Sequence, residues 1–331
     1  MKRGFPKKLG IFLGLAIGVI GLLILFLHDN PLAVPKAELI KKIVAGVVII
    51  VAMVCYVVLY DKITTLPVEL WHNRKLIWKL AKSDFKTRYA GSYLGVVWAT
   101  VQPIVTVVLY YFVFQVVFKS RASLNGTDVP YVLWLTAGLV PWFYFSEALG
   151  AGTSALLEYS YLVKKVVFKI SILPIIKIVS ATFTHLFFMG VMLILYFAYG
   201  NAPSIYMIQI LYFSFCMFLF VLAISYATCA IVIFFRDLSQ IIGIVLQVGM
   251  WATPILWDIQ LIAKAPQWIR ILIKMNPVFY IVDGYRNALY GKMWFWQNFY
   301  STMYFWIVVA LLFGVGTLVF KRLKPHFADT L

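Results

Sequence analysis

Long apolar runs constrain the fold of this chain more than any other feature of its sequence. Several runs approach 20 residues, the length that a helix needs to cross roughly 30 Å of hydrocarbon. Hydrophobic residues make up 63% of the 331 residues and charged residues only 12%. The sequence therefore predicts an all-α polytopic membrane protein. We expect eight spans, at residues 9–27, 43–60, 93–118, 132–150, 170–199, 205–235, 241–257 and 300–320.

Lysine and arginine positions predict the orientation of these spans. If both termini lie in the cytoplasm, the inner segments hold eighteen basic residues and the outer segments ten, as the positive-inside rule requires. The net charge of +17 could also suit nucleic acid, but the charges lie between apolar runs, so we expect no nucleic-acid partner. The first run could be a cleaved signal peptide, but its long apolar core and the lack of an Ala-x-Ala site favour a retained span.

A basic amphipathic stretch at residues 68–90 precedes the third span. Its apolar residues recur at helical spacing and its lysines lie opposite them. The apolar positions are Leu70, Ile77, Trp78, Ala81 and Phe85, and the lysines are Lys75, Lys79, Lys82 and Lys86. Such a helix is expected to lie on a membrane surface, where its cations meet anionic head groups or phosphates.

Motifs for enzymatic chemistry are missing from the sequence. Residues 284–293 come nearest to a P-loop, but their spacing is wrong and they lack the Ser or Thr that holds magnesium. The three cysteines stand alone in apolar segments and predict neither a metal site nor a disulfide framework. We expect this chain to bind no cofactor or metal. If transport uses ATP, another chain must bind it. An enzyme with a dispersed site stays open as the less favoured reading.

Charged and aromatic residues inside the spans allow two readings each. Glu147 and Lys177 could pair with each other, or both could reach the cytoplasmic boundary by snorkelling. His185 fits a hydrogen-bonded core residue better than a proton relay. Tyr110, Phe114 and Phe118 share one helix face, which could line a sugar path or simply pack.

Two further segments lie between the predicted spans. Residues 156–168 mix aromatic, aliphatic and basic side chains, so they could form a helix that lies on the inner leaflet or docks in the groove of a partner. Residues 258–299 contain Pro and Gly between apolar stretches that are too short to cross the bilayer. We expect outer, re-entrant half-helices there.

Several motifs in order resemble those of the ABC-2 permeases that export teichoic acids, O-antigens and related cell-surface polysaccharides, with the teichoic acid branch most similar. They lie at residues 83–98 (SDFKTRYAGSYLGVVW), 102–103 (QP), 235–238 (FRDL), 251–257 (WATPILW), 276–286 (NPVFYIVDGYR) and 327–329 (FAD). This resemblance divides the chain into two additional N-terminal helices at residues 1–66 and a six-span permease domain at residues 67–331.

The resemblance implies a homodimer in the bacterial cytoplasmic membrane, bound to two copies of a separate ABC ATPase that binds ATP and magnesium. The substrate would be an undecaprenyl-diphosphate-linked polysaccharide or teichoic acid. The contacts implied for the diphosphate are Arg74, Lys75, Lys79, Lys82 and Arg88. Those for the glycan channel are Trp98, Tyr110, Phe114, Phe118 and Trp251. Those for ATPase coupling are Glu158, Tyr159, Tyr161, Leu162, Lys164, Lys165 and Phe168. Those for the outer gate are Asn276, Pro277, Asp283, Tyr285 and Arg286.

Departures from the family pattern leave some features open. The first two spans are not part of it, and Lys169 stands where many relatives carry proline after phenylalanine, so the shape of the coupling segment is undefined. Two other functions remain as alternatives. One is an ABC-2 exporter of a small hydrophobic drug or lipid, against which the basic helix argues. The other is a membrane glycosyltransferase or polymerase, which would need a cluster of acidic residues.

Overall fold

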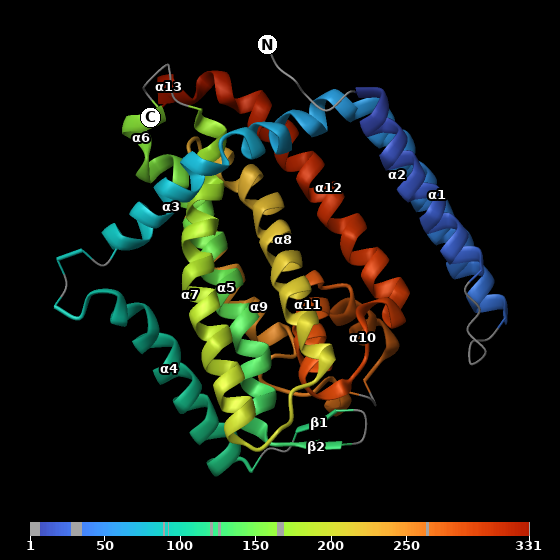
Figure 1. Cartoon of the computed structure of the whole chain (residues 1–331), viewed down its shortest axis with the longest axis vertical. Coiled ribbons are helices and arrows are strands. Elements are labelled where there is room, and N and C mark those ends of the chain that lie inside the picture. Colours follow the sequence, from blue (N-terminus) through green and yellow to red (C-terminus); the bar gives the residue numbers. More distant parts are fainter. Residues whose placement is uncertain are drawn as a thin grey trace. The chain divides into compact units, whose positions relative to one another are not determined.

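The structure is a computed structural model that describes residues 7–27, 35–88, 90–91, 93–119, 122–124, 127–163, 169–262 and 265–330. Helices dominate it (Figure 1). In the described part, the single sheet is a hairpin of β1 (Ala122–Leu124) and β2 (Thr127–Val129). The chain divides into two compact units, Met1–Asn73 and Arg74–Leu331, and each is described by itself.

The first unit is a pair of antiparallel helices, α1 (Lys7–Leu27) and α2 (Pro35–His72). Three glycines on one face of α1, four residues apart, allow the two backbones to approach closely. A Cβ atom at Gly10, Gly14 or Gly18 would lie 1.8, 2.1 or 2.5 Å from the side chains of Tyr60, Tyr56 and Met53, respectively. This small-residue spacing is typical of helices that associate inside a bilayer. The Tyr56 hydroxyl also donates to the Gly10 carbonyl at 3.0 Å.

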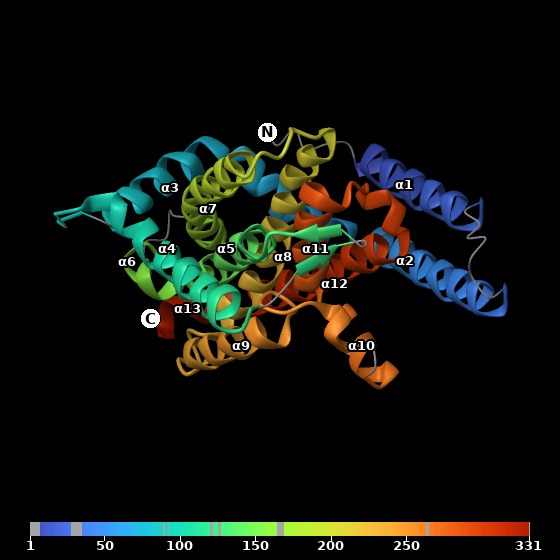
Figure 2. The same ribbon diagram turned by 90° about the horizontal axis from the view of Figure 1, so that it is seen from below.

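The core of the second unit is formed by four long helices: α5 (Tyr131–Glu158), α7 (Leu173–Ala198), α8 (Gln209–Ile231) and α12 (Phe299–Leu323). Helix α5 is apolar on almost every side and packs against α7 and α8, so it is the most buried of the four. Figure 2 shows α5 and α8 at the centre of this unit, with α4 and α9 at its margin.

Shorter helices cover the two ends of this bundle (Figure 1). One end carries α3 (Arg74–Arg88), α6 (Ser160–Val163) and α13 (Phe327–Thr330), and we call it the α3 end. The opposite end carries the β-hairpin, α10 (Gln267–Lys274) and α11 (Pro277–Arg286). The remaining helices are α4 (Trp98–Tyr111), α9 (Leu238–Ala252), π-turns at Phe112–Val117 and Asn287–Gly291, and 3₁₀ turns at Gly95–Val97, Ile170–Ile172, Ile205–Ile208, Ile259–Ile262, Phe295–Asn298 and Lys324–His326.

The fold class predicted from the sequence is confirmed. Six helices among the described residues are long and apolar enough to cross a membrane, and each falls on a predicted span. The other two predicted spans, 43–60 and 241–257, fall on shorter apolar segments, Lys42–Val58 within α2 and α9.

Helix boundaries differ from the predicted ones where backbone chemistry intervenes. The predicted span at 241–257 is wrong at its end, because α9 stops at Ala252: Thr253 precedes Pro254 and takes extended angles (φ −85°, ψ 137°). The predicted helix at 68–90 is shorter, since residues 68–72 continue α2 and α3 begins at Arg74. The boundary between the two compact units along the chain, after Asn73, coincides with this break between α2 and α3.

Glycines set the start of the third predicted span. Gly91 (φ 83°) and Gly95 (φ 51°) lie between α3 and α4 in left-handed conformations that favour glycine. Helix α4 therefore begins at Trp98 rather than at residue 93.

Candidate functional site

The sequence predicted that the basic amphipathic helix lies on a membrane surface. In the structure, α3 packs against α7. Ile77 and Ala81 are buried in this contact. The Phe183 ring of α7 lies 5.2 Å from the Trp78 ring and 5.5 Å from the Phe85 ring. The apolar face predicted from spacing thus faces protein, although Trp78 stays 57% exposed.

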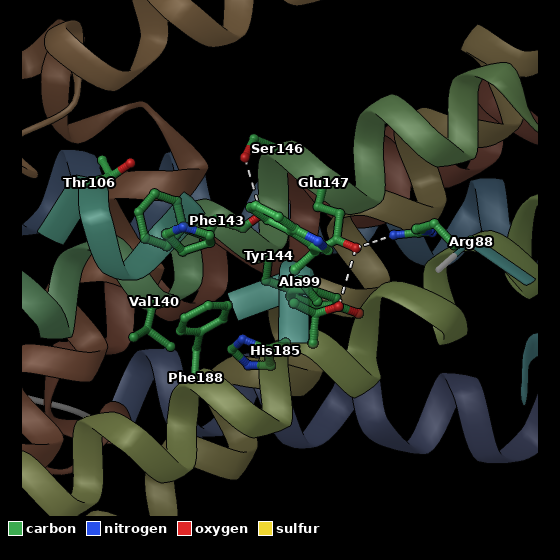
Figure 3. A pocket seen from close by; sticks show the side chains of 13 residues that line it. Arg88, Ala99, Thr106, Val140, Phe143, Tyr144, Ser146, Glu147, His185 and Phe188 are labelled. Carbon is green, nitrogen blue, oxygen red and sulfur yellow. Dashed lines mark hydrogen bonds and ion pairs between the residues drawn. The ribbon is translucent and has the colours of Figure 1, made fainter. Parts of the chain in front are cut away.

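A cavity of about 460 Å³ lies where α3, α4, α5 and α7 meet (Figure 3). Its walls combine aromatic rings with polar groups. The rings are those of Trp98, Phe143, Tyr144, His185 and Phe188, and the polar side chains are those of Arg88, Thr106, Ser146, Glu147 and Thr184. Arg88 forms an ion pair with Glu147 at the edge of this cavity, and Thr184 donates to the same carboxylate at 3.3 Å.

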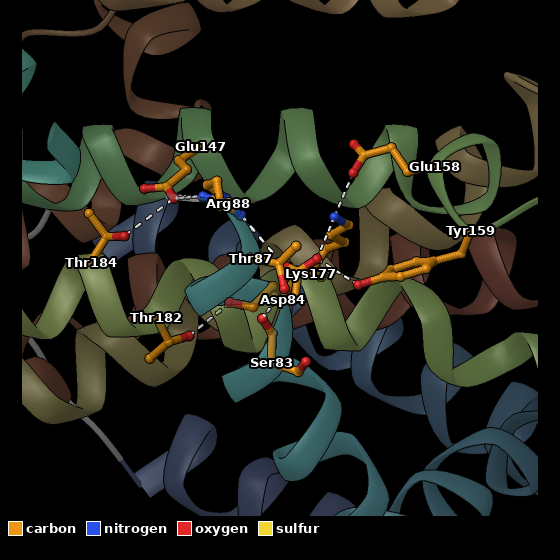
Figure 4. A network of polar contacts seen from close by, with 11 residues as sticks. Ser83, Asp84, Thr87, Arg88, Glu147, Glu158, Tyr159, Lys177, Thr182 and Thr184 are labelled. Carbon is orange, nitrogen blue, oxygen red and sulfur yellow. Dashed lines mark hydrogen bonds and ion pairs between the residues drawn. The ribbon is translucent and has the colours of Figure 1, made fainter. Parts of the chain in front are cut away.

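A network of charged side chains, with Asp84 and Lys177 buried at its centre, extends from this ion pair toward the α3 end of the bundle (Figure 4). The Lys177 ammonium lies 2.6 Å from an Asp84 oxygen and 2.5 Å from a Glu158 oxygen. The Tyr159 hydroxyl donates to Asp84 at 2.6 Å, and Arg88 lies 3.7 Å from the second Asp84 oxygen. The network therefore links α3 to the start of α7 and to the end of α5.

Asp84 is the centre of this network. Burial acts to raise the pKa of its carboxyl, but the hydrogen bonds from Lys177 and Tyr159 outweigh burial and hold the pKa below its ordinary value. Asp84 is therefore a carboxylate at neutral pH, and it provides part of the negative charge that balances Lys177 and Arg88.

The structure corrects the pairing of Glu147 with Lys177 and, for Lys177 alone, the snorkelling reading. Glu147 and Lys177 do not pair with each other, because Glu147 meets Arg88 whereas Lys177 meets Asp84 and Glu158. Lys177 does not snorkel to solvent either, since its side chain is only 8% exposed. His185 is a hydrogen-bonded core residue, as expected: its Nε2 lies 3.1 Å from both the Ser214 and Tyr285 hydroxyls.

The five residues predicted at the substrate entrance occupy two environments. Arg74, Lys75, Lys79 and Lys82 are exposed along α3. Arg88 differs, because its guanidinium already meets the carboxylates of Asp84 and Glu147. An anionic ligand would therefore have to share this arginine with two protein carboxylates.

The predicted channel residues lie on α4 (Trp98 and Tyr110), in or just after the π-helical segment that continues it (Phe114 and Phe118), and on α9 (Trp251). Rings of Tyr110, Phe114 and Phe118 follow one another at centroid distances of 6.3 and 5.9 Å. Phe114 also stacks on Tyr131 of α5 at 6.1 Å, so part of this face is packing within the protein. Trp98 and Trp251 are 51% and 55% exposed.

The predicted coupling residues are only partly described. Glu158 and Tyr159 end α5 and belong to the charge network. Tyr161 and Leu162 lie in α6, where Tyr161 is 58% exposed. Lys164, Lys165 and Phe168 lie outside the described residues.

The predicted outer-gate residues act mainly inside the protein. Asn276 caps α11 by accepting from the Val278 amide at 3.0 Å, and Pro277 occupies the first turn. Asp283 accepts from Asn287 at 2.9 Å. Tyr285 is fully buried and Arg286 is 3% exposed, so neither is available to line an open gate in this conformation.

Arg286 binds the backbone that follows α9. Its Nη1 donates to the Pro254 carbonyl at 2.7 Å and its Nη2 to the Ile255 carbonyl at 2.8 Å. Its guanidinium also lies 3.4 Å from the Trp134 ring centre on α5. The arginine thus joins α5, α11 and the loop at 253–257, a role that the sequence did not reveal. Among the described residues, no cluster of His, Cys, Asp and Glu is arranged to hold a metal ion.

Known proteins similar to this chain are membrane permeases. The O-antigen export system permease protein RfbA of Myxococcus xanthus is 27% identical over 263 residues, which cover 80% of this chain and 98% of that protein. Two RfbA permeases of Klebsiella pneumoniae are 26% and 27% identical over 256 residues, 76% of this chain and 93% of theirs. The family model described as ABC-2 type transporter matches residues 75–290, which include α3 from its second residue, the charge network and α11. The chain belongs to the ABC-2 type transporter family.

Proposed function

We propose that this chain is the permease subunit of an ATP-driven exporter that moves a lipid-linked polysaccharide across the bacterial cytoplasmic membrane. The observation that carries the proposal is the similarity to three O-antigen export permeases over 93–98% of their own length. Teichoic acid remains a second possible polymer. The excess of lysine and arginine in the proposed inner segments supports an orientation with both termini in the cytoplasm.

The energy source would be a separate ABC ATPase, two copies of which bind ATP and magnesium. Its docking surface would include α6 and the predicted coupling residues around it. The charge network gives this surface a physical connection to α3, because Glu158 at the end of α5 shares Lys177 with Asp84. A displacement of the end of α5 would therefore act directly on α3.

Dimerisation would use the faces that α4 and α9 leave open in the single chain. Helix α9 buries only Ile242, and its Ile244, Val245 and Val248 are 60–61% exposed. None of the α4 residues whose side chains are described is buried. Two such helices from each protomer could enclose a path for the glycan, with Trp98, Phe118 and Trp251 presenting aromatic surface to it.

The substrate diphosphate would meet the cations of α3 at the α3 end. Arg88 is suited to two-point contact with phosphate oxygens, and its present partner Glu147 would hold that position while the substrate is absent. The exposed lysines would supply point charges that draw the anionic lipid toward the cavity.

Export in living cells tests the proposal. Deletion of the gene in its host should remove the surface polysaccharide and leave its lipid-linked precursor on the inner side of the membrane, and the wild-type chain should restore export. Surface staining and extraction of lipid-linked glycan measure the two pools. A normal surface polymer after deletion would contradict the proposal.

A further inference from the structure

An apolar groove of about 800 Å³ lies between α3, the start of α4 and α7. Lys82 at its border is also one of the cations assigned above to the substrate entrance, but the proposed transport function gives the apolar recess itself no role. Four aromatic side chains form most of its wall and two lysines lie on its border. These residues are Trp78, Phe85, Phe183, Phe187, Lys82 and Lys86.

The aromatic wall of the groove is built by contacts between α3 and α7. Phe183 meets Trp78 edge-on, with ring planes at 71°, and also contacts Phe85. Helix α3 is fixed on α7 by the burial of Ile77 and Ala81. The shape of the recess is therefore fixed by packed helices. Its rings present apolar surface, which an apolar chain can cover without removing polar groups from water.

The two lysines give the groove a charge that its other residues do not balance. Both Lys82 and Lys86 are exposed, and neither has an ion-pair partner within the described residues. In contrast, Arg88 of α3 and Lys177 of α7 are matched by carboxylates. An apolar recess with two unbalanced cations at its border is complementary to an anionic amphiphile.

We propose that this groove binds an anionic phospholipid of the surrounding bilayer, with one acyl chain along the aromatic wall and its phosphate at Lys82 and Lys86. Lysines are flexible point charges. They suit a single phosphate that needs no fixed two-point geometry, whereas such a geometry would require an arginine. A bulk lipid also fills a weak site by mass action. Ala99 and Thr184 line both this groove and the cavity beside Arg88, so the bound lipid forms part of the cavity boundary.

Lipid titration of the delipidated full-length chain tests this site. The probes are phosphatidylglycerol and phosphatidylcholine with identical acyl chains, and native mass spectrometry counts the bound molecules. The wild-type chain should bind one phosphatidylglycerol at a concentration at least tenfold lower than phosphatidylcholine. Each lysine near an anionic head group contributes roughly a fivefold factor in affinity, so Lys82→Gln with Lys86→Gln should weaken phosphatidylglycerol binding about 25-fold.

Matched variants separate the groove from general surface charge. Lys75→Gln with Lys79→Gln removes the same charge from the same helix, but these lysines do not line the groove, so phosphatidylglycerol binding should change less than threefold. Thr100→Trp should fill the recess and reduce binding of both lipids while leaving all cations in place. Equal binding of the two lipids, or equal losses in the two lysine pairs, would overturn the proposal. Exclusive retention of a polyprenyl-linked lipid would overturn it as well, because the groove would then belong to the substrate.

Discussion

Arg88 and Lys177 show how little a charged residue's position in the sequence reveals about its partner. Both lie near the α3 end, yet each is matched by a carboxylate from another helix. Lys177 depends more strongly on its counter-charge, because its side chain and that of Asp84 are only 8% and 7% exposed. Removing one partner of such a pair leaves an uncompensated charge in a poorly solvated place.

We expect Lys177→Met to destabilise the second unit by about 3 kcal/mol, since Asp84 would lose its main counter-charge. The double variant with Asp84→Asn should recover much of this loss, because it removes the orphaned charge. Thermal unfolding in detergent measures both. Lys82→Met, on the exposed side of α3, is the control and should change stability little. If the double variant were no more stable than Lys177→Met, the buried ion pair would not be the cause.

The depressed pKa of Asp84 predicts a pH dependence. A carboxyl group whose pKa is lower in the folded state stabilises that state above its unfolded pKa, and the contribution is lost as the pH falls through the folded pKa. Asp84→Asn should therefore be less stable than the wild-type chain at pH 7, and the difference should shrink below the ordinary aspartate pKa of 3.8. Unfolding temperatures from pH 7 to pH 3 give the comparison. A constant difference across that range would refute this prediction.

Single residues determine where helix α9 ends and how closely α1 and α2 pack. Helix α9 stops before Pro254, and the loop that follows depends on Arg286, which binds two consecutive carbonyls there. In the first unit, the glycines of α1 determine how closely α2 can pack. These features act through backbone geometry rather than through hydrophobicity.

Arg286→Lys should lower the stability of the region around α11 and the loop at 253–257 by about 2–3 kcal/mol, because an ammonium cannot serve two carbonyls and the Trp134 ring in the geometry of the guanidinium. Limited proteolysis should then cut the loop at 253–257 faster. Arg270→Lys, an exposed arginine on α10, provides the matched control and should leave the cleavage rate unchanged. Equal protection in both variants would show that Arg286 does not hold the loop.

Gly14→Leu should separate α1 from α2, because even a Cβ atom at this position would lie 2.1 Å from the Tyr56 ring. The readout is a disulfide between cysteines at Leu25 and Gly46, which lie in contact across the pair. The crosslink should form in the parent chain and be lost with Gly14→Leu. Gly21→Ala is the control, since its nearest neighbour in α2 is 4.0 Å away. A crosslink that survives Gly14→Leu would contradict this packing.

At the scale of the whole molecule, the proposed dimer predicts that α9 faces its symmetry copy. Val245→Cys, in a chain whose three native cysteines are alanine, should form a disulfide-linked dimer in membranes. Leu311→Cys on α12 is equally exposed, at 64% against 60%, and should remain monomeric because α12 would face lipid. Gel mobility under oxidising conditions distinguishes the two. The reverse pattern would place the dimer interface on α12 and remove the proposed glycan path.

The length of the hydrophobic runs was enough to predict the positions of the membrane-spanning segments from the sequence. All eight predicted spans fall on apolar helical segments, because roughly 20 apolar residues have few other stable environments. The β-hairpin was missed, although Asn125 and Gly126 between its strands form a recognisable turn signal. The glycine face of α1 and the stop before Pro254 were also readable from the sequence, but spans chosen by hydropathy ignore both.

The sequence by itself determined the fold class, the family resemblance and the cationic character of α3, since each depends on composition or on residues close together in the chain. Only the tertiary structure decided that Arg88 meets Glu147, that Lys177 meets Asp84 and Glu158, and that Arg286 is buried. These contacts join residues on different helices, and Arg88 and Glu147 are 59 positions apart. Helix periodicity gives the direction of a side chain around its own axis, but the partner it meets depends on how the helices pack.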